Sequence, residues 1–153
     1  MTTFFAALHH GAVLTLLVCA LVSIHQLRQP LTLAGARRLR TTDRVNGTAA
    51  TLVLVVGLAR VFYLEKGPAY YFGNGPFLAK LAFYGLASVL SLVPTVEVRR
   101  WRVALQNGQP PILSARKTRA LRTVAYLQLA CLAAMAACAN ISARGGDWQF
   151  FGP

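Results

Sequence analysis

Acidic residues are scarce in this chain. Its 153 residues include four carboxylates against sixteen lysines and arginines, which gives a formal net charge of +12. Asp43, Glu65, Glu97 and Asp147 all lie away from the centres of the apolar stretches. A hydrolase with paired acid and base carboxylates is therefore not expected. A nucleophile elbow and a phosphate-binding glycine loop are absent too, so any catalysis would depend on a cofactor, and whether the protein is an enzyme stays open.

Cysteine is also scarce. Cys19, Cys131 and Cys138 lie in apolar stretches and lack the spacing of a disulfide framework or a zinc site. Cys131 and Cys138 are seven residues apart among alanines, a pattern that predicts a small-residue helix face packed closely against a neighbour.

Charged residues make up only 13% of the chain, whereas hydrophobic residues make up 56% and the mean hydropathy is +0.49. A soluble domain does not bury that much apolar surface. The apolar residues form four continuous stretches of about 20 residues, the length of helix that crosses a hydrocarbon core of ~30 Å. We therefore expect one all-α domain over residues 1–153, a polytopic membrane four-helix bundle with helices at 3–25, 46–64, 77–96 and 120–141.

The start of the chain and the basic residues predict the orientation. No lysine or arginine precedes the first apolar stretch, so it is interpreted as a retained helix and not as a secretory signal. Twelve of the sixteen basic residues follow the first and third stretches: Arg28, Arg37, Arg38, Arg40, Arg44, Arg99, Arg100, Arg102, Arg116, Lys117, Arg119 and Arg122. Because basic residues concentrate in cytoplasmic loops, both termini should face the periplasm (N-out, C-out) of a multi-pass protein in the bacterial inner membrane.

The high positive charge does not predict binding to nucleic acid. Base-stacking aromatic residues do not alternate with the arginines, whereas contact with anionic membrane lipids at the cytoplasmic face accounts for the charge. Trp101, which arginines flank, is interpreted as an anchor in the lipid interface.

Polar residues recur inside the third stretch at helical spacing. Steps of three or four residues place them on one face of a helix. They are Lys80, Tyr84, Ser88, Ser91 and Thr95. This stripe should face the bundle interior, where it either lines a cavity or joins helices by hydrogen bonds.

Five residues from the four stretches fall at similar depth near the expected periplasmic face: His10, Arg60, Lys80, Tyr84 and Met135. Ionisable groups inside a membrane are costly and mark functional sites, although Arg60 and Lys80 could also extend to the headgroups. We predict that the five form a pocket for an anionic ligand, with His10 as a metal ligand or proton carrier. His9 and His10 point about 100° apart, and the sequence leaves open which one faces the interior.

Haem b is one candidate ligand, because helix bundles hold haem between facing helices and two cations could pair with its propionates. All three histidines lie in the first stretch, so two of them cannot sandwich a haem from different helices of one chain. Iron would need His10 together with Met135, Tyr84 or Lys80, a five-coordinate state, or a dimer.

Short motifs run through residues 57–102: Gly57-Leu58-Ala59-Arg60, Glu65-Lys66-Gly67, Tyr70-Tyr71, Asn74, Phe77, Lys80-Leu81, Ser91, Pro94-Thr95 and Trp101-Arg102. Together with Leu8-His9-His10 and Arg37-Arg38-Leu39, they resemble the bacterial membrane family called domain of unknown function 2214. The resemblance covers the first three stretches, and the fourth by hydropathy, and it implies a membrane fold and no activity. A weaker likeness to the HemJ-type haem-binding protoporphyrinogen oxidase rests on His10 and Lys80, and it favours a tetrapyrrole ligand.

Three functions remain open. The best supported is a small redox protein that binds haem, another tetrapyrrole or another anionic ligand in a periplasmic-side pocket. The second is an accessory or assembly subunit whose fourth helix packs on a larger membrane complex, or on a second copy. The third is a small-anion transporter, which four helices without an inverted repeat would make unusually thin.

Overall fold

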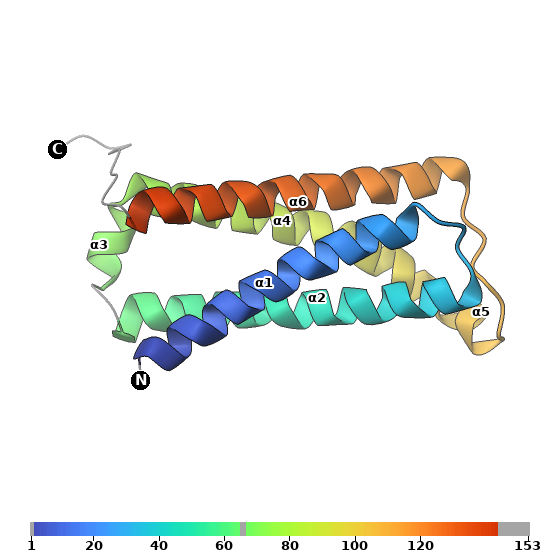
Figure 1. The fold of residues 1–153 in the computed structure, drawn as a ribbon, viewed down its shortest axis with the longest axis horizontal. Coiled ribbons are helices and arrows are strands. Elements are labelled where there is room, and N and C mark those ends of the chain that lie inside the picture. The colour runs from blue at the N-terminus through green and yellow to red at the C-terminus, as the bar shows by residue number, and fades with distance from the viewer. Residues whose placement is uncertain (1, 65–66, 144–153) are drawn as a thin grey trace.

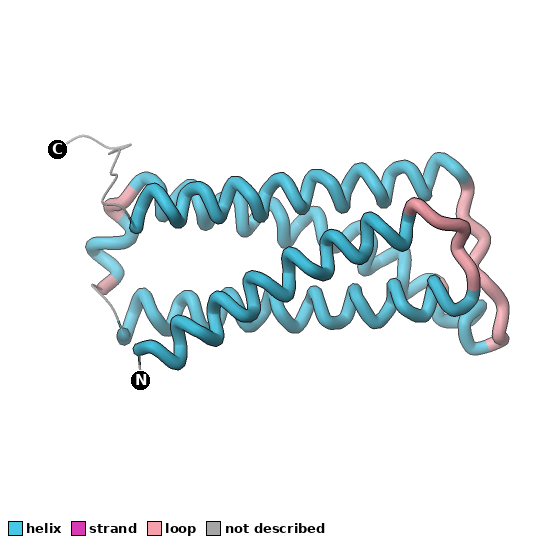
Figure 2. Tube along the Cα trace, viewed as in Figure 1, coloured by secondary structure: helices cyan, strands magenta, loops and turns pink. Residues whose placement is uncertain are grey.

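Four long helices lie along one axis and form the bulk of the fold (Figure 1). The computed structural model describes residues 2–64 and 67–143. The elements are α1 (Thr2–Leu27), α2 (Leu33–Ala59), the π-helix η1 (Arg60–Leu64), α3 (Pro68–Phe72), α4 (Gly75–Arg100), α5 (Arg102–Gln106) and α6 (Ala115–Ala143). Throughout these described ranges the chain forms helices and short connections and no strand, as Figure 2 shows. The predicted all-α four-helix bundle is confirmed.

Four segments are long and apolar enough to cross a membrane: α1, α2 with η1, α4 and α6. They span 25 to 32 residues. Large apolar side chains also cover their outward faces; Leu14 on α1 and Val89 on α4, for example, are 59% and 63% exposed. Lipid tails solvate such faces, whereas water does not. The exposed surface is therefore that of a multi-pass membrane bundle.

The helices extend beyond the limits predicted from the apolar stretches. α2 begins at Leu33 rather than at residue 46, because most of the first basic segment is helical. Thr32 caps this helix, and its hydroxyl accepts a hydrogen bond from the backbone N–H of Gly35 at 3.1 Å. α4 likewise continues past Pro94 to Arg100. Arginine is a good helix former, so the basic segments prolong the helices where connections were predicted.

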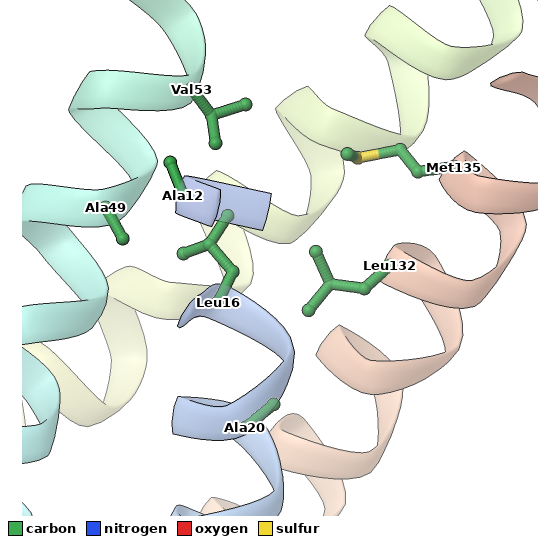
Figure 3. Close-up of a cluster of buried hydrophobic side chains, with 7 residues drawn as sticks. All are labelled: Ala12, Leu16, Ala20, Ala49, Val53, Leu132 and Met135. Carbon is green, nitrogen blue, oxygen red and sulfur yellow. The ribbon is translucent and has the colours of Figure 1, made fainter. Parts of the chain in front are cut away.

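The central core joins α1, α2 and α6. Figure 3 shows its buried side chains, which are Ala12, Leu16, Ala20, Ala49, Val53, Leu132 and Met135. Alanines let helix backbones approach closely in a membrane. The side of α6 that carries Cys131 and Cys138 also packs inward, because both cysteines are buried. Ala133 and Ala137, in contrast, are exposed. The predicted small-residue face therefore packs through its cysteines, while these two alanines face outward.

A second apolar cluster corrects the interpretation of Trp101. This residue is only 4% exposed, and it packs with Leu27, Leu39, Val98 and Leu105. α5 follows Trp101 directly, and its Leu105 belongs to the same cluster as the tryptophan. Trp101 is thus a core residue, and the prediction that it anchors in the lipid interface is wrong.

The two ends of the bundle differ in charge. At one end, called the pocket end, lie the start of α1, η1, α3, the start of α4 and the last turn of α6 (Figure 1). At the other, called the basic end, α1 connects to α2, and α5 leads towards α6. Of the basic residues in the described part of the chain, only Arg60 and Lys80 lie in the half with the pocket end. The described basic residues are therefore concentrated at the basic end, and these two are the exceptions.

Candidate functional site

A cavity of about 100 Å³ lies inside the bundle at the pocket end. Its polar lining comes from α1, η1, α3 and α4, through His9, Arg60, Tyr71, Lys80 and Tyr84. Apolar side chains that include Val53, Phe77 and Met135 complete the wall. The cavity, which is partly open to the outside, thus brings two cations, a histidine and two phenols together among largely apolar side chains.

Four of the five residues predicted to share a pocket line this cavity, namely Arg60, Lys80, Tyr84 and Met135. His10 does not. It is exposed on α1, and its Nδ1 lies 2.6 Å from the carbonyl oxygen of Ala6. His9, which is 9% exposed, lines the cavity instead. Because neighbouring residues on a helix point about 100° apart, the bundle interior receives only one of the two histidines.

Gly57 on α2 determines where the His9 ring can lie. A Cβ atom at position 57 would lie 3.2 Å from His9 Cε1 and 3.7 Å from its Nδ1. The first distance is shorter than an ordinary van der Waals contact, so the ring packs directly against the glycine backbone. Gly57 therefore lets α1 and α2 approach closely enough for His9 to form part of the cavity wall.

Arg60 enters the cavity where the helix type changes. The α-helical pattern of α2 ends at Ala59, and Arg60–Leu64 forms a π-helix. Short π-helical turns occur frequently at functional sites. The apolar pattern predicts an uninterrupted helix to residue 64 and does not mark this change.

The start of α4 positions Lys80. Asn74 caps the helix through its side-chain oxygen, which accepts a hydrogen bond from the backbone N–H of Phe77 at 3.0 Å. The hydroxyl of Ser142 lies 3.4 Å from the same oxygen and connects the end of α6 to this cap. One turn further on, the Lys80 ammonium lies 5.6 Å from the centre of the Phe77 ring, within cation–π range. The cap, the aromatic ring and the cation therefore form one local unit.

Tyr84 joins α4 to α2 beside the cavity. Its hydroxyl donates a hydrogen bond to the carbonyl oxygen of Ala50 at 2.8 Å. Because the phenol has a single proton, this bond leaves its oxygen only as an acceptor towards the cavity.

The predicted polar stripe of α4 divides between the two roles left open for it. Lys80 and Tyr84 line the cavity. Ser88 and Ser91 donate to backbone carbonyls of their own helix, at 2.9 and 2.7 Å. Thr95, at the end of the stripe, donates to the Asp43 carboxylate of α2 at 2.7 Å. The stripe thus lines a cavity at one end and joins two helices at the other.

The cavity is too small to enclose a tetrapyrrole. An apolar cavity of about 150 Å³ holds benzene, so a cavity of about 100 Å³ does not enclose a much larger haem ring. For a metal ion without a porphyrin, no three His, Cys, Asp or Glu side chains within residues 2–64 and 67–143 lie close enough together to hold it. A smaller ligand is the better match to the volume.

A family model described as "Predicted membrane protein (DUF2214)" matches residues 1–146. The chain belongs to this family. The match includes all four long helices and the cavity, and it confirms the resemblance carried by the motifs in residues 57–102. The family description and the four helices of membrane-spanning length both identify this DUF2214 protein as a multi-pass membrane protein. Comparison with curated proteins and with solved structures gave no match.

Proposed function

We propose that this DUF2214 protein binds a small organic anion of the carboxylate class in the cavity at the pocket end. The observation that carries the proposal is that Arg60 and Lys80, from two different membrane-spanning segments, line one interior cavity. Ionisable residues inside membrane segments typically mark substrate or ion sites. A guanidinium can bind a carboxylate through two parallel hydrogen bonds, and an ammonium adds a mobile point charge.

The remaining wall favours an organic anion over an inorganic one. Phe77, Tyr71, Val53 and Met135 give the cavity a mainly apolar surface with few polar groups, as is usual in small-molecule sites. Its volume is below that of a cavity that holds benzene, but the cavity is partly open, so an anion of about six non-hydrogen atoms can enter with part of its chain outside. A short monocarboxylate meets both conditions.

His9 and Tyr84 have different roles in this proposal. A neutral imidazole carries one donor and one acceptor, so His9 can donate to an anion. Tyr84 already donates its proton to Ala50, and it therefore holds α4 against α2 instead of donating to the ligand. The contacts with the anion come from His9, Arg60 and Lys80.

We further propose that the cavity faces the periplasmic side of a bacterial inner membrane. Twelve described basic residues lie towards the basic end, which the positive-inside rule assigns to the cytoplasm. A membrane-impermeant thiol reagent tests this with Ser114→Cys, at an exposed position of the basic end. Labelling only after cell lysis supports the orientation, and labelling in intact cells contradicts it.

A titration of the protein in nanodiscs with butyrate, followed by calorimetry, tests the proposed ligand class. Hydrogen bonds to charged groups contribute about 1.5–3 kcal/mol, so Arg60→Gln or Lys80→Met should weaken binding by about 10- to 100-fold. Lys80→Arg should retain binding. The matched control is Arg119→Gln, which removes a charge from an exposed position of α6 near the basic end.

Two results would contradict the proposal. The first is that neither acetate nor butyrate binds the unaltered protein. The second is that both bind, with affinities that Arg60→Gln and Lys80→Met leave unchanged. A Soret band that appears on addition of haemin and disappears in His9→Ala would instead assign a tetrapyrrole to the protein.

A further inference from the structure

A second candidate site lies on the outside of the bundle, along the seam between α1 and α2. Three adjoining hollows of about 560, 480 and 600 Å³ follow one another along this seam. The first two share Val22, Gln26 and Arg38, and the last two share Val45. Together they form a groove, called the seam groove, that runs from the basic end towards the pocket end.

The path of α1 explains why the groove opens. α1 lies beside α2 at the pocket end and runs obliquely towards α6 at the basic end (Figure 1). Arg28 directly follows α1, and its Nε donates a hydrogen bond to the hydroxyl oxygen of Tyr126 on α6 at 3.1 Å. Because α1 diverges from α2 towards the basic end, side chains between the two helices become exposed. Val18 and Val22 of α1 and Val45 of α2 lie on the outer surface there.

Arginines line each hollow of the seam groove: Arg38 lines the first, Arg37 and Arg38 the second, and Arg44 the third. Arg37 and Arg38 line the hollow of about 480 Å³ together with Val18, Val22 and Val45. The apolar run of α1 gives way to His25 and Gln26 directly beyond this level. We therefore expect the two guanidiniums to lie where hydrocarbon changes to headgroups, and the valines to lie at the depth of acyl chains.

The charge of this hollow is not neutralised by the described chain. Within residues 2–64 and 67–143, neither Arg37 nor Arg38 forms an ion pair with a carboxylate; the ion pairs found there join Glu97 to Arg100 and Lys117. Asp43, the acid closest in sequence, accepts a hydrogen bond from Thr95 of α4. The hollow of about 480 Å³ therefore presents two exposed cations beside an apolar path.

We propose that the seam groove binds one anionic phospholipid from the leaflet at the basic end. Arg37 and Arg38 bind the headgroup phosphate, and an acyl chain lies against Val18, Val22 and Val45. Two cations without an acidic partner favour a headgroup of net negative charge over a zwitterionic one, which carries its own cation. This inference is independent of the ligand of the interior cavity.

Native mass spectrometry of the detergent-purified protein tests the proposal, with phosphatidylglycerol and phosphatidylcholine as probes. A basic side chain near an anionic lipid surface contributes a factor of about five, so Arg37→Gln/Arg38→Gln should weaken phosphatidylglycerol binding by about 25-fold. The control Arg102→Gln/Arg119→Gln removes the same charge from other exposed positions at the basic end and should have little effect. Val45→Trp fills the apolar path and should also weaken binding, although it leaves the charge unchanged.

The other possible occupants give distinct results that would overturn the proposal. Equal binding of the two lipids, or equal losses in the two double variants, would show a diffuse charge effect instead of a site. Displacement of the lipid by inorganic phosphate at similar concentration would show that the acyl chain contributes nothing. A dimer that Val45→Trp dissociates in the absence of lipid would assign the groove to a second copy. Thermal unfolding in lipid-free detergent checks that all variants remain folded.

Discussion

Gly57→Ala tests the packing that positions His9 in the cavity. The new methyl group would lie 3.2 Å from His9 Cε1, so either the ring or α2 must move by a few tenths of an ångström. Because His9 lines the cavity of about 100 Å³, a displaced ring would change the shape of that cavity. We therefore expect both a less stable bundle and a weaker affinity for butyrate.

Two opposing effects determine the size of the change in stability. Overpacking of a buried contact typically costs about 1–3 kcal/mol. Replacing glycine by alanine in a helix returns about 1 kcal/mol. Gly47→Ala supplies the second effect alone, because Gly47 lies on the same helix and a Cβ there would meet no atom within 4 Å. The difference in the free energy of unfolding between the two variants should then equal the overpacking cost of about 1–3 kcal/mol.

Unfolding by SDS in mixed micelles measures this difference, and calorimetry measures the affinity for butyrate. Gly47→Ala should be neutral or stabilising and should bind as the unaltered protein does. If the two variants unfold with the same free energy and bind equally, then His9 does not pack against Gly57, and the described cavity wall is wrong.

Three further substitutions test separate parts of the site. Asn74→Ala removes the cap that accepts from the Phe77 N–H, and it should lower the free energy of unfolding by about 1 kcal/mol in SDS titrations. Tyr84→Phe removes the hydrogen bond to Ala50 and should lower the free energy of unfolding by about 0.6 kcal/mol, the average for interhelical hydrogen bonds in membranes. A loss of butyrate binding free energy greater than this would mean that the phenol itself contacts the ligand. His10→Ala should leave calorimetric butyrate binding unchanged, because the side chain is exposed on the outer surface.

Bilayer geometry explains why the cavity could be located from the sequence. Hydrocarbon thickness fixes the length of each apolar stretch, and counting from the helix ends then gives the depth of each polar residue. Arg60, Lys80, Tyr84 and Met135 come together because antiparallel helices return to the same depth. This part of the prediction needs no knowledge of side-chain packing.

Rotation of a helix about its axis does not follow from depth. His9 and His10 lie at almost the same depth, yet His9 packs against Gly57 in the interior and His10 is exposed. Trp101 is buried for a similar reason, since its contacts with Leu27 and Leu39 join parts of the chain far apart in sequence. Such positions depend on tertiary packing, which a hydropathy pattern does not contain.

The ends of the helices were also beyond the apolar pattern. α2 starts at Leu33 because Thr32 caps it and arginines sustain the helix, and both signals lie outside the apolar stretch. The π segment that begins at Arg60 has no counterpart in composition or periodicity. Threonine is a residue type that typically caps helices, so the sequence contains a signal for the start of α2 but none for the π segment.

The central claim is that a small carboxylate binds beside His9, and histidine-selective 15N NMR during a butyrate titration tests it most directly. The chain has three histidines, so each ring gives separate signals that His9→Gln, for example, identifies. We predict a saturable shift of the His9 signals with unchanged signals from His10 and His25, and loss of that shift in Lys80→Met. Unchanged His9 signals at saturating butyrate, or equal shifts of all three rings, would contradict the account.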